Sequence, residues 1–140
     1  MISKKYVPLI YFILGFGLFM FTRLSRLVPT IDLAIIIAPI LILRFIRTQP
    51  LRRGIWLTLL GFLLSMNMAL WGLFEFDETW MTILFGLIRS SVLAVIWFMP
   101  FMLDRIIYPK FSLRGLWSTL IFPILTTAFF FLSSLEGPFD

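Results

Sequence analysis

The sequence predicts an all-α fold, a polytopic transmembrane helix bundle of about five spans, and its composition and charge pattern are the observations that predict it. Of the 140 residues, 61% are hydrophobic and 14% are charged, whereas soluble domains carry about 25% charged residues. The mean hydropathy is +1.04. Most charged residues lie between long apolar runs, which is typical of helices that cross lipid. We therefore expect residues 1–140 to form one transmembrane domain.

Five apolar runs correspond to the five predicted spans. These spans lie near residues 6–22, 30–45, 55–74, 80–103 and 116–135. The first run resembles a signal peptide, but no small-residue cleavage site follows it, so we expect an uncleaved span. Pro39 interrupts the second run, and both a proline-kinked span and a re-entrant hairpin fit this segment. If the second run does not cross, the protein has four spans.

The basic residues predict an orientation, because cytoplasmic loops are enriched in Lys and Arg. With five spans, one side of the membrane carries Lys4, Lys5, Arg44, Arg47, Arg52, Arg53, Arg105, Lys110 and Arg114, and the other carries Arg23 and Arg26. We expect a bacterial-type inner (cytoplasmic) membrane, with the N-terminus cytoplasmic and the C-terminus outside. The four-span alternative leaves the orientation unchanged from Arg44 onward. We read the net charge of +5 as loop charge, not as a nucleic-acid surface.

The residue types that are missing exclude several kinds of chemistry. The chain has no Cys and no His, which excludes thiolate nucleophiles, zinc–thiolate and Fe–S sites, His-based metal or haem sites and Ser–His–Asp triads. No paired carboxylates and no Lys lie within a predicted span. We therefore expect no catalytic residues, no metal site and no cofactor, and no catalysis by this chain alone.

Arg89 is the main candidate for a binding residue. It lies ~13 Å below the outer end of the fourth predicted span, at 1.5 Å per residue from Trp80. A cation at such depth costs about 2.5–3.5 kcal/mol on insertion scales. The functional interpretation is a cation that holds a lipid phosphate or a substrate carboxylate. In the structural interpretation Arg89 snorkels outward or pairs with Asp32 or Glu75.

Four further polar residues complete the set of lipid- or substrate-binding candidates. Asn67 is the one strongly polar residue of the third predicted span, where an amide more often joins two helices than binds a ligand. Ser90 and Ser91 could form hydrogen bonds between helices or back onto their own helix. Asp32 is either a first-turn residue near the outer surface, favoured by the helix dipole, or a buried partner of Arg89.

Two stretches resemble a known membrane-protein family. One is Ala34–Arg47, AIIIAPILILRFIR, and the other runs from Pro100 through Leu103-Asp104-Arg105 and Pro109 to LIFP at 120–123 and SSLEGPF at 133–139. Together they resemble the N-terminal membrane region of the apolipoprotein N-acyltransferase family and its nitrilase-linked relatives. The resemblance covers roughly residues 30–140. One departure is Phe130, which stands where relatives tend to carry a Glu.

The resemblance implies several spans followed by an extracytoplasmic nitrilase-like domain with a Glu–Lys–Cys triad, which moves an acyl chain from phospholipid to a lipoprotein. That triad cannot form here, because the chain has no Cys. The leading hypothesis is therefore a non-catalytic, lipid-embedded module that binds lipid or a partner. The alternative is a small membrane scaffold or transporter-type subunit. The expected partners are membrane lipids, a second copy of the chain or other membrane helices, and no nucleic acid.

Overall fold

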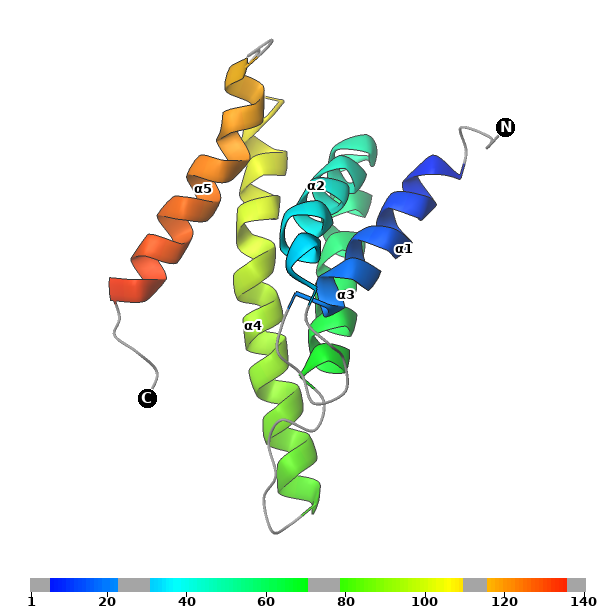
Figure 1. Ribbon diagram of the computed structural model, residues 1–140, viewed down its shortest axis with the longest axis vertical. Coiled ribbons are helices and arrows are strands. Elements are labelled where there is room, and N and C mark those ends of the chain that lie inside the picture. The colour runs from blue at the N-terminus through cyan, green and yellow to red at the C-terminus, as the bar shows by residue number, and fades with distance from the viewer. Residues whose placement is uncertain (1–5, 23–30, 71–78, 110–115, 136–140) are drawn as a thin grey trace. The chain divides into compact units, whose positions relative to one another are not determined.

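The computed structural model describes residues 6–22, 31–70, 79–109 and 116–135, and the regular structure within them is helical. The helices are α1 (Val7–Met20), α2 (Asp32–Thr48), α3 (Leu51–Ala69), α4 (Thr79–Ile107) and α5 (Leu116–Leu135) (Figure 1). The all-α class and the five-helix order are confirmed. The chain divides into two compact units, Met1–Phe98 and Met99–Asp140.

The predicted polytopic bundle is wrong. Among the described residues, α4 alone is long and apolar enough to cross a membrane. It has 29 residues, and its most apolar 18-residue stretch has a mean hydropathy of 1.9. α1 has only 14 residues, which gives ~21 Å at 1.5 Å per residue and does not reach across a hydrocarbon core of ~30 Å.

The charges near 44–53 explain why α2 and α3 also differ from the predicted spans. The sequence predicts a basic connector there, but α2 continues to Thr48 and α3 begins at Leu51. Arg44 and Arg47 therefore lie inside α2, and Arg52 and Arg53 lie inside α3. α2 is one helix through Pro39, so the re-entrant hairpin is also excluded.

The first unit is built around the antiparallel pair of α1 and α2. Pro8 lies in the first turn of α1, where its missing N–H leaves no hydrogen bond unmade. The N–H of Ile31, just before α2, donates to the carbonyl of Phe21, just after α1, at 2.9 Å. Gly15 of α1 lies against Ile42 of α2, and a Cβ at Gly15 would be 3.0 Å from its side chain.

α3 packs against this pair through a stripe of small residues. Gly61 and Ser65 are buried, and the Phe16 ring lies directly over Gly61. The Ser65 hydroxyl donates to the carbonyl of Phe16 at 3.1 Å. Small side chains let two helix backbones approach closely, so the polar hydroxyl reaches a main-chain acceptor on the neighbouring helix. The other helix face, with Trp56 70% exposed, turns away from this core.

Aromatic rings fill the space between the helices of the first unit. Phe62 of α3 is fully buried and makes edge contacts with Phe16 and Phe19, with ring centroids 5.3 and 5.0 Å apart. Phe19 also contacts Trp97 of α4, and Phe62 contacts Phe98. Such edge-to-face pairs each add about 0.5–1.5 kcal/mol beyond the area that they bury. The contacts of Trp97 and Phe98 join α4 to α1 and α3.

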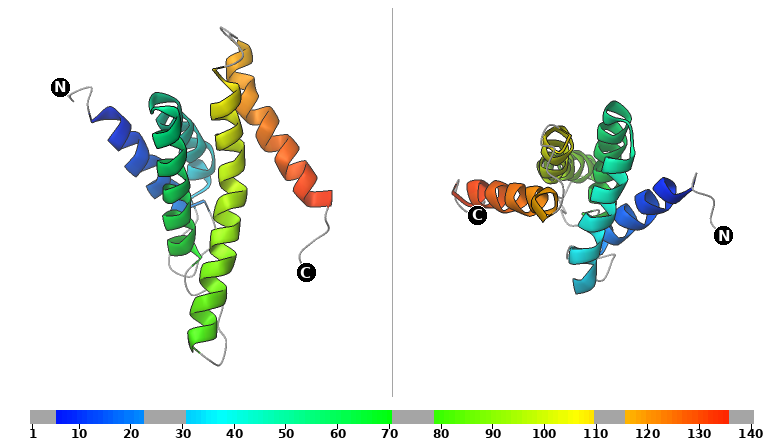
Figure 2. Two further views of the ribbon diagram at one scale, coloured as in Figure 1. Left: turned by 180° about the vertical axis from the view of Figure 1, so that it is seen from behind. Right: turned by 90° about the horizontal axis from the view of Figure 1, so that it is seen from above.

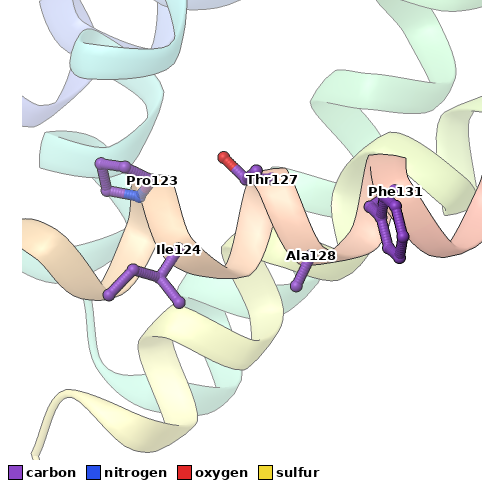
Figure 3. A pocket seen from close by; sticks show the side chains of 5 residues that line it. All are labelled: Pro123, Ile124, Thr127, Ala128 and Phe131. Atoms are coloured by element: carbon purple, nitrogen blue, oxygen red, sulfur yellow. The ribbon is translucent and has the colours of Figure 1, made fainter.

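In the second unit, the last part of α4 packs against α5. The rings of Phe101 and Phe122 lie 4.6 Å apart. α5 has the predicted bounds of the fifth run, 116–135. An open groove of about 490 Å³ runs along α5 and is lined by Pro123, Ile124, Thr127, Ala128 and Phe131 (Figure 3).

Candidate functional site

A polar contact between α3 and α4 brings together two of the predicted site residues. The Ser90 hydroxyl donates to Oδ1 of Asn67 at 2.8 Å. The Asn67 side chain is oriented by its own helix, because Nδ2 donates to the carbonyl of Leu63 at 2.8 Å. Ser90 is only 2% exposed. The contact is therefore a fixed hydrogen bond between two apolar helices.

The Ser90 hydroxyl also lies close to acceptors on its own helix. It also donates to the carbonyl of Gly86 and lies 3.5 Å from that of Leu87. A hydroxyl has one proton, so these carbonyls compete with Asn67 for the same donor. Back-bonding of this kind satisfies the hydroxyl when the neighbouring helix is absent and can bend the helix that carries it. Asn67 thus gives the Ser90 hydroxyl an acceptor on a second helix, in addition to the acceptors on its own helix.

The chemistry of this contact is structural. A serine acts as a nucleophile only when a base activates it. The chain has no His, and within described residues 6–22, 31–70 and 79–98 the only carboxylic acid is Asp32, in the first turn of α2. The described residues contain no cluster of acidic side chains that could hold a metal ion. The contact joins α3 and α4 through a partly buried hydrogen bond.

The structure describes the other predicted site residues only in part. Arg89 is exposed, and Ser91 is half-buried. Asp32 begins α2, but its side chain lies outside the described part of the structure, so the pairing with Arg89 stays a prediction. Glu75, the other predicted partner, lies in 71–78, which is also outside it.

Asp104 is a polar residue that the sequence interpretation missed. The sequence predicts a connector at this position, but α4 continues to Ile107 and Asp104 is fully buried. The signal was present in the spacing of Ala94, Phe98 and Phe101, which follow one helix face and are all buried. Continuing that face by one turn reaches Asp104. A buried carboxyl group is stable only when polar groups hold it, which makes Asp104 part of the internal structure.

Comparison with known proteins gives no match: no family model, no curated protein and no solved structure is similar to this chain. The resemblance to the apolipoprotein N-acyltransferase family therefore stays a prediction.

Proposed function

We propose that the protein is a lipid-contacting module, in which α4 crosses the membrane once and the packed helices α1–α3 contact lipid from one side. It has no reaction centre of its own in this proposal, and its role is to hold lipid or a membrane partner. One observation carries the proposal, namely the combination of high hydropathy and exposure in α4.

The exposure of α4 separates a membrane helix from the core helix of a water-soluble protein. Only 17% of its most apolar 18-residue stretch is buried inside the protein. A core helix of equal hydropathy would be mostly covered, because exposed apolar surface is costly in water. The exposed side chains include Trp80, Leu84, Ile88 and Val92. Lipid tails solvate such a surface at no cost.

The polar contact supports a placement of the first unit in the bilayer. Ser90 lies ~15 Å along α4 from Trp80, at 1.5 Å per residue. This distance equals half of a hydrocarbon core of ~30 Å. Trp80 is 58% exposed and suits a membrane–water interface. With Trp80 at one interface, the Asn67–Ser90 contact lies near the bilayer midplane.

The orientation follows from charges on either side of α4. Glu75, Asp77 and Glu78 precede the helix, and Arg105 in its last turn is followed by Lys110 and Arg114. Basic flanks favour the cytoplasmic side. We therefore infer that α4 begins outside and ends on the cytoplasmic side of a bacterial-type inner membrane.

The test introduces charge into the exposed face of α4. We expect the double variant Leu84→Asp/Val92→Asp to release the protein from membranes during alkaline carbonate extraction. Asp at position 92, near the centre of the span, costs about 2.5–3.5 kcal/mol on insertion scales, and Asp at position 84, ~6 Å below Trp80, adds to this cost. Both side chains are about half exposed, at 47% and 53%, so a protein folded in water would tolerate the change. Circular dichroism checks that the variant stays helical.

Tyr108→Asp is the matched control, because Tyr108 is exposed just after the end of α4. This variant should stay in the membrane pellet like the wild type. Release of the wild type itself, or retention of the double variant, would contradict the proposed crossing.

A further inference from the structure

The connection between α2 and α3 gathers four arginines at one end of the first unit. α2 ends at Thr48 and α3 begins at Leu51, so the connection consists of Gln49 and Pro50. We call this the arginine elbow: Arg44 and Arg47 at the end of α2, and Arg52 and Arg53 at the start of α3. Arg44, Arg52 and Arg53 are exposed, and Arg47 is half-buried.

Local structure holds the elbow tight. Gln49 has the extended backbone expected before a proline, with φ −92° and ψ 154°. Gly54 is buried, and a Cβ there would be 3.1 Å from the carbonyl oxygen of Ile46. This close approach sets the first turn of α3 directly against the last turn of α2, and Figures 1 and 2 show the two helices joined at that end. The four cations are therefore neighbours in space.

The two arginines in the first turn of α3 do not stabilise this helix. Arg52 and Arg53 lie in its first turn, which contains no acidic residue. The helix dipole disfavours cations at this end and favours anions. Within described residues 6–22, 31–70 and 79–98, the only acidic residue is Asp32. It lies at the other end of α2, ~18 Å along the helix from Arg44 and ~22 Å from Arg47 at 1.5 Å per residue. Among the described residues, Arg44, Arg52 and Arg53 have no ion pair, whereas Arg47 takes part in an interaction.

The position of the elbow points to an anion at a membrane surface. α3 runs antiparallel to α4, because Asn67 meets Ser90 while Phe62 meets Phe98. Arg52 and Arg53 lie ~21–23 Å along α3 from the midplane contact. Half of a bilayer with its headgroups is ~20–23 Å thick. The arginines therefore reach the level of the phosphates on the side to which α4 runs.

We propose that the arginine elbow binds the phosphate headgroups of anionic phospholipid in the cytoplasmic leaflet. This inference rests on the proposed membrane placement and names the lipid class. Arg guanidinium groups form paired hydrogen bonds with phosphate oxygens, and the anionic cytoplasmic leaflet attracts clustered basic residues. Leu51, at 46% exposure, begins α3 directly beside these arginines.

The experiment measures lipid preference at the elbow itself. The chain has no Cys, so a fluorophore on Leu51→Cys is a single label. The full chain is reconstituted into phosphatidylcholine vesicles that contain phosphatidylglycerol, and either lipid carries the brominated quenching chain at an equal mole fraction. We expect brominated phosphatidylglycerol to bind more tightly by about fivefold for each arginine engaged at low salt. In 1 M salt the preference should largely disappear, because the Debye length falls to ~3 Å.

The triple variant Arg44→Gln/Arg52→Gln/Arg53→Gln should quench equally with both lipids. Thr48→Gln, which changes an exposed uncharged residue at the same end of α2, is the control and should keep the preference. Equal quenching of the wild-type elbow by both lipids overturns the elbow proposal and leaves the membrane placement intact. A preference that survives the triple variant also overturns it. If neither brominated lipid quenches the fluorophore on Leu51→Cys, the elbow does not lie at a bilayer. A fluorophore on Val92→Cys then shows whether α4 is inserted.

Discussion

At the scale of single residues, Gly61 determines how closely α1 and α3 approach. A Cβ at this position would lie 2.5 Å from ring atoms of Phe16. Phe16 is itself only 5% exposed and is held by neighbouring rings, so its ring has no free space into which it can move. We expect Gly61→Ala to destabilise the protein by about 1–3 kcal/mol, the usual cost of an overpacked core.

Gly17→Ala is the matched control, because nothing lies within 4 Å of the Cβ that it adds. This change in the same helix pair should be neutral or stabilising, since alanine favours a helix over glycine by about 1 kcal/mol. Thermal denaturation in detergent, followed by circular dichroism, compares the two variants. Equal stability of Gly61→Ala and Gly17→Ala would show that the Phe16 ring does not lie against α3.

The hydrogen bond between Asn67 and Ser90 makes a second prediction at this scale. A double-mutant cycle with Asn67→Ala and Ser90→Ala should give a coupling free energy of about 0.6–1.7 kcal/mol, the range of such bonds between membrane helices. The value is modest because Ser90 also has acceptors on its own helix. A parallel cycle with Ser91→Ala, next along α4, should give no coupling to Asn67→Ala. Coupling of Ser91→Ala to Asn67→Ala, or no coupling of Ser90→Ala, would contradict the hydrogen bond between Asn67 and Ser90.

At the scale of elements, α4 has two parts that face different surroundings. From Thr79 to Arg89 nearly every side chain is exposed or half-exposed, and the buried stripe begins at Ser90 and continues through Ala94 and Phe98. Most apolar side chains of the first part are therefore at least partly exposed. The site at which packing begins is also the site of the hydrogen bond to α3.

The sequence predicts some of these elements well. The bounds of α5 match the fifth apolar run, and α4 contains the whole of the fourth. Asn67 and Ser90 could be named because polar groups within apolar helices usually serve to join helices. The contact between Asn67 and Ser90 could not be predicted, because the hydropathy of a sequence does not show which residues of two helices lie side by side.

The predicted spans were wrong where the length of an apolar run was taken as the length of a helix. Hydropathy marks how apolar a segment is, but helix ends are set by local geometry. α1 ends at Met20, and α2 runs on through Arg44 and Arg47 to the extended residue before Pro50. The same basic residues can form either a connector between two spans or the adjoining ends of two helices, and hydropathy does not distinguish these two structures. The buried Asp104 was missed for the same reason, because its helix continues beyond the apolar run.

At the scale of the whole molecule, exposed apolar side chains occur on each of the five helices. The examples include Ile13 on α1, Ile36 on α2, Leu64 on α3, Val92 on α4 and Ile124 on α5. A site for one protein partner would concentrate such residues in one patch. Their spread over every helix agrees with the proposed contact with lipid.

Cysteine accessibility tests the crossing of α4 most directly, since the chain has no Cys of its own. Single cysteines are placed at Thr79, Val92 and Tyr108, whose side chains are all exposed in the isolated chain, and intact cells are treated with a membrane-impermeant maleimide. We expect Thr79→Cys to be labelled in intact cells and Tyr108→Cys only after permeabilisation. Val92→Cys should stay unlabelled until the protein is denatured, because lipid covers it. Labelling of Val92→Cys in permeabilised cells as rapid as that of Tyr108→Cys would show that α4 lies in water and would contradict the proposed membrane crossing.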